Sequence, residues 1–431
     1  MRLSLKKSTV LQTIYTKSVI SFCLKLMSAA ILYIVTVIVT RKLGKSESGI
    51  YFIGYSLTII SCEISRLGLD NVLLKRVGIH SGNQLWGGAN SLLKTTMRMV
   101  VFPSCIVGGL IWLFSFEIAA NIFSEPELSS TLSYFSLSIP FLAALTLLCI
   151  AFQGASHTFS SIILSSIMPP GILGIALLVL PIKTSEQTTI VYSFSIIFTF
   201  VVSYLGWIKA VPRGLESKSI SVKTLLNESF PLLWVAVMSQ GLSIGTIIIL
   251  GIIEGADEVS QFVTAQRVSL IISFTLVAVN VAYAPRYAQL YSESNLSGIK
   301  SLSYSSTKFM LLLSIPIFLV LSVFPKYVMS VFGPEFAHSS HVLVILCFAQ
   351  MVNVMTGSVG ILLAMTNHQI VLRNAVSVTG IFSLLLVCIL SYAFGLTGAA
   401  IASSLGLAAQ NLFLVIIVKR NLGINTITFW K

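Results

Sequence analysis

LSYFSLSIPFLAALTLLCIAF, residues 132–152, carries no charged side chain and is long enough to cross a lipid bilayer as a single helix. The hydrocarbon core of a membrane is about 30 Å thick, and a helix needs roughly 20 residues to cross it. Runs of the same kind recur along the chain at 19–40, 49–74, 100–116, 162–180, 190–208, 230–252, 262–283, 309–324, 342–365, 375–394 and 399–418. The sequence therefore predicts an all-α polytopic membrane protein with about 12 transmembrane helices.

The composition agrees with a chain that is embedded in the membrane along its whole length. Of its 431 residues 55% are hydrophobic and only 10% are charged, against roughly 25% charged residues in a typical soluble domain. The net charge of +13 would suit nucleic acid only on a basic face of a soluble fold. We therefore expect membrane lipids as partners, and no nucleic acid.

The six cysteines lie in or beside apolar runs, with no CxxC motif and no Cys/His cluster. Metal-binding and disulfide frameworks need such spacings. We expect the cysteines to pack in the core, and we expect neither a metal nor another cofactor.

The basic residues sort to one side of the predicted membrane. If the N-terminus is inside the cell, most of the 27 Lys and Arg residues fall in cytoplasmic segments or at the helix ends beside them. Cytoplasmic loops of membrane proteins carry an excess of Lys and Arg. Both termini are therefore predicted to be cytoplasmic.

The two halves of the chain show a weak internal repeat. An offset of 211 residues aligns Gly44 with Gly255, Glu47 with Glu258, Tyr51 with Phe262, Lys75 with Arg286, His157 with His368 and Lys209 with Arg420. We expect two parallel six-helix bundles, residues 1–211 and 224–431, joined by a cytoplasmic linker at 212–223 (PRGLESKSISVK). Two such bundles can enclose a central cavity and open it to alternate sides of the membrane by rocking.

A few charged residues interrupt the apolar runs. An ionised side chain at the centre of a membrane costs about 3 kcal/mol, so these residues should face the interior of the protein. Arg66, Arg267 and Lys25 offer positive charge to a cavity and could bind an anionic substrate such as a pyrophosphate. Glu63 and Asp70 lie three residues before and four residues after Arg66 on one predicted helical face. They could couple transport to an ion or form a structural ion pair, while Lys25 could extend to the membrane surface.

Several amides also fall within the predicted helices. They could line a path for sugars or bond one helix to another. These residues are Gln153, Gln240, Asn280, Gln350, Asn353, Gln410 and Asn411.

The sequence contains no nucleotide-binding loop and no hydrolase motif, so we expect a transporter that is not an enzyme.

Three segments resemble motifs of the polysaccharide transporter family. They are RKLGKSESGIY (41–51), SRLGLDNVLLKR (65–76) and FVTAQRV (262–268). That family includes Wzx-type O-antigen flippases and lies within the multidrug/oligosaccharidyl-lipid/polysaccharide exporter superfamily. Arg66, Gly68 and Asp70 match the pattern of the second helix, and Ala265 and Arg267 match that of the eighth.

The resemblance implies a flippase of the bacterial inner membrane that moves an undecaprenyl-pyrophosphate-linked oligosaccharide to the periplasmic leaflet. An O-antigen polymerase and a chain-length regulator are its candidate partners. An ion-coupled multidrug exporter of the same superfamily is the first alternative. Such exporters often use a carboxylate in the first helix, where this chain has Lys25. A polysaccharide polymerase is the second alternative, and the short loops of this chain disfavour it.

Overall fold

The computed structural model describes residues 2–212 and 221–427, and these residues are helical without a β-strand. The chain divides into two compact units, Met1–Val237 and Met238–Lys431. The predicted bundle 1–211 and linker 212–223 both fall in the first unit, and residues 213–220 of the linker lie outside the described part.

The first unit holds the helices α1 (Arg2–Ser65), α2 (Leu69–Gly82), α3 (Trp86–Leu113), α4 (Ser115–Glu117), α5 (Leu128–Gly154), α6 (Thr158–Ile162), α7 (Met168–Val179), α8 (Ser185–Ala210) and the start of α9 (Val222–Ile253). Two π-helical turns, η1 (Ile118–Ile122) and η2 (Ile163–Ile167), complete it. The second unit holds the end of α9, α10 (Ala256–Ser292), α11 (Leu296–Val323), α12 (Pro325–Ser330), a 3₁₀ turn η3 (Pro334–Ser339), α13 (Ser340–Met355), α14 (Val359–Met365) and α15 (Gln369–Leu422).

The membrane-spanning character predicted from the sequence is confirmed. Within the described residues eight helices are long and apolar enough to cross a membrane, and the bent helix α9 brings the number to nine. Two of the eight, α1 and α15, are broken at Gly44 (φ 75°, ψ −173°) and Gly395 (φ 58°, ψ −139°). Helix α15 therefore carries two predicted apolar runs, and α1 carries one run and most of a second, which continues on α2. All twelve predicted runs lie mainly on helices, although 49–74, 100–116 and 342–365 each cross a short non-helical break.

The backbone repeats at the offset predicted from the sequence. Gly255, the partner of Gly44, has nearly the same dihedral angles (φ 91°, ψ −171°). Ser156 (φ 66°) and Asn367 (φ 62°), which directly precede the aligned histidines, are both left-handed. Positive φ angles are uncommon outside glycine, so their recurrence at a fixed spacing indicates that the two halves of the chain are variations of one structure.

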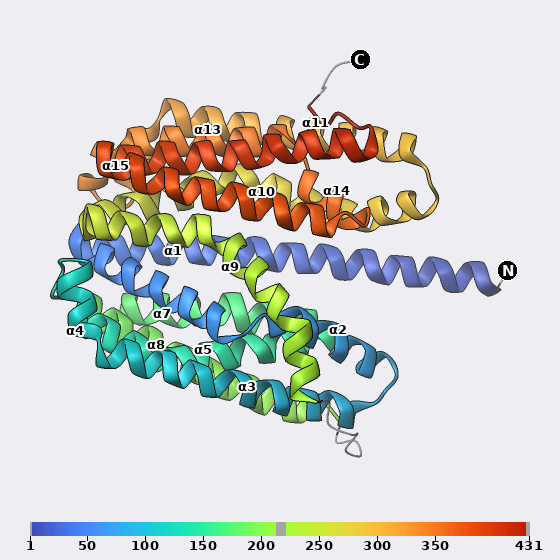
Figure 1. Cartoon of the computed structure of the whole chain (residues 1–431), viewed down its shortest axis with the longest axis horizontal. Coiled ribbons are helices and arrows are strands. Elements are labelled where there is room, and N and C mark those ends of the chain that lie inside the picture. The colour runs from blue at the N-terminus through green and yellow to red at the C-terminus, as the bar shows by residue number, and fades with distance from the viewer. Residues whose placement is uncertain (1, 213–220, 428–431) are drawn as a thin grey trace. The chain divides into compact units, whose positions relative to one another are not determined.

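One helix lies at the centre of each unit. In the first unit α5 packs against α1, α2, α3 and α8, and in the second α13 packs against α10, α11 and α15. Their membrane segments are about two-thirds buried, whereas the other segments are at most about two-fifths buried. The offset of 211 residues places α5 on α13 and α14, so the same element of the repeat forms both cores (Figure 1).

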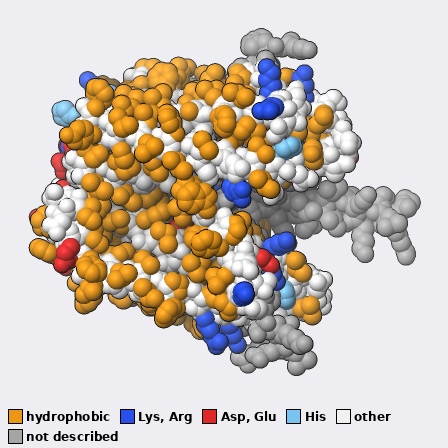
Figure 2. Space-filling model, in the orientation of Figure 1, with side chains coloured by type: hydrophobic (Ala, Val, Ile, Leu, Met, Phe, Trp, Pro, Cys, Tyr) orange, Lys and Arg blue, Asp and Glu red, His pale blue; other side chains and the backbone are white. Residues whose placement is uncertain are grey.

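The outward faces of the helices are apolar as well. Phe102, Leu312 and Tyr392 are each more than 70% exposed, and Figure 2 shows hydrophobic side chains over most of the displayed face. Lipid chains are the solvent of such a surface.

The expectation that all six cysteines pack in the core is wrong for half of them. Three are buried (Cys62, Cys149 and Cys347), and three are exposed (Cys23, Cys105 and Cys388).

Candidate functional site

The predicted second helix is interrupted where its charged residues cluster. Helix α1 ends at Ser65 and α2 begins at Leu69, and Leu67 (φ 53°) and Gly68 (φ 70°) between them are left-handed. A Cβ atom on Gly68 would collide with the backbone of α9, at the carbonyl oxygen of Ser229 and the amide nitrogen of Leu233. Glycine thus serves two needs here, since it accepts the left-handed backbone and lets α9 approach closely.

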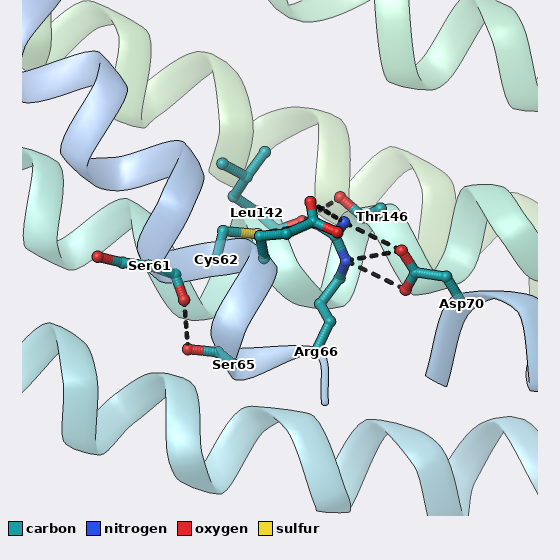
Figure 3. A network of polar contacts seen from close by, with 8 residues as sticks. Ser61, Cys62, Ser65, Arg66, Asp70, Leu142 and Thr146 are labelled. Carbon is teal, nitrogen blue, oxygen red and sulfur yellow. Dashed lines mark hydrogen bonds and ion pairs between the residues drawn. The ribbon is translucent and has the colours of Figure 1, made fainter. Parts of the chain in front are cut away.

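The side chain of Arg66 bridges this break (Figure 3). Its Nε donates to the carboxylate oxygens of Asp70 on α2 at 3.0 and 3.1 Å. Its Nη2 donates to Glu63 Oε2 on α1 at 2.5 Å, and its Nη1 contacts Cys62 Sγ at 3.3 Å. One guanidinium therefore fastens the end of α1 to the start of α2.

The network is largely removed from solvent. Arg66 and Glu63 are 9% and 8% exposed, and the side chain of Asp70 is 26% exposed. Leu142 and Thr146 of α5 lie beside it (Figure 3). Two carboxylates face one guanidinium, so the three side chains carry a net charge of −1 when all are ionised. Glu63 and Asp70 occupy most of the five N–H donors of Arg66, so an anionic ligand would compete with them for this guanidinium.

A second ion pair fixes the far end of α2. Arg76 Nη2 donates to Glu228 Oε1 on α9 at 2.6 Å, and its Nε donates to Glu228 Oε2 at 3.3 Å. Both of these side chains are partly exposed. The break at Gly68 and this pair together hold both ends of α2 against the first part of α9.

The other two predicted cations come from other segments of the chain. Lys25 is exposed on α1, and Arg267 is half-buried on α10 in the second unit. A shared cationic cavity formed by Lys25, Arg66 and Arg267 stays a prediction. Glu63 and Asp70 have the geometry of a structural ion pair, and a role in ion coupling also stays a prediction.

A cavity of about 370 Å³ with both polar and apolar walls lies within the second unit. Gln350, Asn353 and Gln410, three of the amides that the sequence places within helices, all line it. Sequence reasoning did not single out their neighbours Ser243, Gln266, Ser269, Ser273, Ser403 and Ser404. Serines and amides are common in membrane helices and carry no periodic signal, so only the fold brings them together.

The first unit has a larger and mainly apolar groove of about 970 Å³. Helices α3, α5 and α8 form it, with Trp112, Leu137 and Phe141 among its walls. Among the described residues, no group of three or more His, Cys, Asp or Glu side chains could hold a metal ion.

Solved structures resemble this chain over almost its whole length. An inward-closed structure of the lipid II flippase MurJ superposes with a TM-score of 0.75, at 16% identity over 93% of this chain and 87% of that one. An inward-facing multidrug resistance MATE family transporter of the MOP superfamily superposes with a TM-score of 0.71, at 12% identity over 92% and 94% of the two chains. The chain has the fold of a MOP-superfamily transporter.

Sequence comparisons point to the same group of proteins. The MatE family model matches residues 231–360, from α9 to α14 of the MOP fold. A probable low-salt glycan biosynthesis flippase, Agl15 of Haloferax volcanii, is 24% identical over 393 residues, which is 90% of this chain and 80% of that protein. All of these relatives are described as transporters or flippases.

Proposed function

We propose that this chain is a flippase of the bacterial inner membrane. It moves an undecaprenyl-pyrophosphate-linked oligosaccharide, a repeat unit of O-antigen or a related surface polysaccharide, from the cytoplasmic to the periplasmic leaflet. Both termini are cytoplasmic in this proposal, and the two halves rock against each other to give alternating access. An O-antigen polymerase and a chain-length regulator would act on the product.

The resemblance to two flippases carries the proposal. One, a probable glycan biosynthesis flippase, is similar in sequence over 90% of this chain, and the other, a lipid II flippase, is similar in fold over 93% of it. The MOP fold alone would suit several cargoes, because the multidrug transporter matches almost as well. The similarity to Agl15, a probable glycan biosynthesis flippase, favours a glycan cargo.

The charged residues support a pyrophosphate headgroup. A guanidinium binds pyrophosphate oxygens with paired hydrogen bonds, and Arg66 already makes such bonds to carboxylates in a nearly dry environment. The headgroup would take the place of one carboxylate on Arg66, with Arg267 and Lys25 as further cationic contacts. Release of Glu63 or Asp70 from Arg66 would leave a carboxylate without its partner inside the membrane, which offers a route to ion coupling.

The second candidate is an ion-coupled multidrug exporter, and the likeness to the MATE transporters supports it. Against it, the first helix carries the cation Lys25 and no Asp or Glu between residues 19 and 40. A carboxylate on that helix would help to hold a cationic drug or a coupling ion, and a lysine would repel both.

Reconstitution separates the two candidates. The purified protein would be placed in proteoliposomes with lipid-linked oligosaccharide extracted from the source cell, and a membrane-impermeant glycosidase would report the leaflet that the glycan occupies. The same vesicles would be loaded with ethidium and given a proton or sodium gradient. We expect the glycan to change leaflet faster than in protein-free vesicles, with no ethidium transport. Ethidium transport without glycan movement would establish the exporter instead.

A further inference from the structure

The cavity of the second unit lies between four helices. Ser243 comes from α9, Gln266 from α10, Gln350 and Asn353 from α13, and Gln410 from α15. Ser269, Ser273, Ser403 and Ser404 add hydroxyl groups. The apolar parts of the wall include Leu242, Leu346 and Leu407. Among the described residues no Lys, Arg, Asp or Glu lines the cavity, so these walls offer many hydrogen bonds and no counter-charge.

Much of this hydrogen-bonding capacity is available to a ligand. Asn353 Nδ2 donates to Gln350 Oε1 over a long 3.4 Å, and Gln266 Nε2 donates to Ser243 Oγ at 3.3 Å. The Gln410 amide makes no hydrogen bond with the described residues. An amide can make four hydrogen bonds, so Gln350, Asn353 and Gln410 retain both donors and acceptors.

The serines present mainly acceptors to the cavity. Ser269, Ser273 and Ser403 donate their protons to backbone carbonyls of their own helices at 2.8 to 3.1 Å. Ser404 donates to the carbonyl of Ile345 on α13 at 3.2 Å. Their oxygen lone pairs remain for a donor such as a sugar hydroxyl.

We propose that this cavity binds a neutral, hydroxyl-rich sugar residue of the transported glycan. The inference rests on the flippase function proposed above and deepens it by assigning a glycan subsite. The volume falls within the range of about 300–1,000 Å³ that small-molecule sites occupy. An acidic sugar would find no opposite charge among the described wall residues, and a purely apolar ligand would leave the amides of the cavity without partners. A sugar ring satisfies both parts of the wall, with hydroxyls for the amides and C–H faces for the leucines.

Chemical protection of one lining position tests the subsite directly. In a variant whose six native cysteines are replaced by alanine, Ser404→Cys is labelled with a maleimide in the presence of either of two ligands. The first is lipid-linked oligosaccharide from the source cell, and the second is the same lipid after removal of its glycan, the bare polyprenyl pyrophosphate. We expect the glycan-bearing lipid to slow labelling at least fivefold and the bare lipid to have no effect. Ser243→Cys provides an independent second position.

Transport by amide variants supplies the second measurement. Gln350→Leu with Asn353→Leu, and separately Gln410→Leu, remove amides from the cavity. A net hydrogen bond of about 1 kcal/mol corresponds to roughly fivefold, so we expect oligosaccharide flipping to slow by about 5- to 30-fold. Gln153→Leu removes an exposed amide of α5 outside the cavity and is the matched control, with flipping unchanged. Thermal unfolding of each purified variant checks that it is folded.

The outcomes separate the subsite from the function on which it rests. If wild-type protein flips the glycan lipid but labelling is slowed equally by both lipids or by neither, the subsite is wrong and the flippase function stands. Wild-type flipping rates in both sets of amide variants would overturn the subsite in the same way. If the wild-type protein flips no lipid-linked glycan, the flippase function fails first.

Discussion

Replacing Arg66 by glutamine is the sharpest test of the ion-pair network. The change leaves Glu63 and Asp70 facing each other without the guanidinium that bonds to both at 2.5 to 3.1 Å. Removing one partner of a buried pair costs about 3–5 kcal/mol. We expect the free energy of unfolding of Arg66→Gln to fall by that amount, measured by SDS titration followed by tryptophan fluorescence.

A triple variant then separates stability from transport. Glu63→Gln, Arg66→Gln and Asp70→Asn together remove all three charges, so most of the lost stability should return. If Arg66 also binds the pyrophosphate, the triple variant should flip substrate at least tenfold more slowly, because a hydrogen bond to a charged group contributes about 1.5–3 kcal/mol. A triple variant as unstable as the single one would refute the ion-pair account. A folded triple variant with wild-type flipping would refute the substrate role of Arg66.

The exposed pair of Arg76 and Glu228 is the matched control for this series. It joins the same kinds of side chain at 2.6 Å, yet both are partly exposed. Exposed pairs typically contribute at most about 1 kcal/mol. Arg76→Gln should therefore reduce the free energy of unfolding far less than Arg66→Gln.

Further predictions concern other parts of the same units. Gly68→Ala should lower the free energy of unfolding by roughly 2–5 kcal/mol, because the added Cβ would collide with the backbone of α9 and residue 68 has a left-handed backbone. Gly82→Ala, with open space around it, should leave the free energy of unfolding unchanged or raise it by up to about 1 kcal/mol. Glu47→Ala should cost about 0.5–2 kcal/mol in SDS titration, because the carboxylate accepts from the first backbone N–H of α8 at 2.5 Å. Arg267→Gln should slow flipping about tenfold in proteoliposomes. Lys25→Gln removes an exposed charge and should slow flipping only about threefold. Equal effects at the two positions would contradict this ranking.

The sequence predicts the helices well because the membrane constrains them strongly. A span needs a long apolar run, and nine of the twelve predicted runs contain no break between helices, while 49–74, 100–116 and 342–365 each cross one. The internal repeat could also be detected in the sequence. Gly44 and Gly255 align at the offset of 211 residues, and the structure gives both the same unusual backbone conformation. Burial was harder to predict. Lipid and protein core are both apolar, so hydrophobicity alone could not distinguish exposed Cys105 from buried Cys149.

The candidate site was predictable only in part. The spacing of Glu63, Arg66 and Asp70 predicted a shared face of one continuous helix, and in the structure the three side chains meet across a break in that helix. The break at Leu67 and Gly68 depends on the close approach of α9, which is more than 150 residues away along the chain. The cavity of the second unit likewise depends on four helices packing together, so its amides looked no different from others in the sequence.

Deletion of the gene in its source cell tests the central claim most directly. The measurement would determine in which leaflet the lipid-linked repeat units lie. The deletion strain would be complemented with the wild-type gene, Arg66→Ala or Arg267→Ala. We expect repeat units to accumulate on the cytoplasmic face, and wild type alone to restore their appearance on the periplasmic face. Repeat units that reach the periplasmic face in the deletion strain but stay unpolymerised would contradict the flippase account and favour a polymerase.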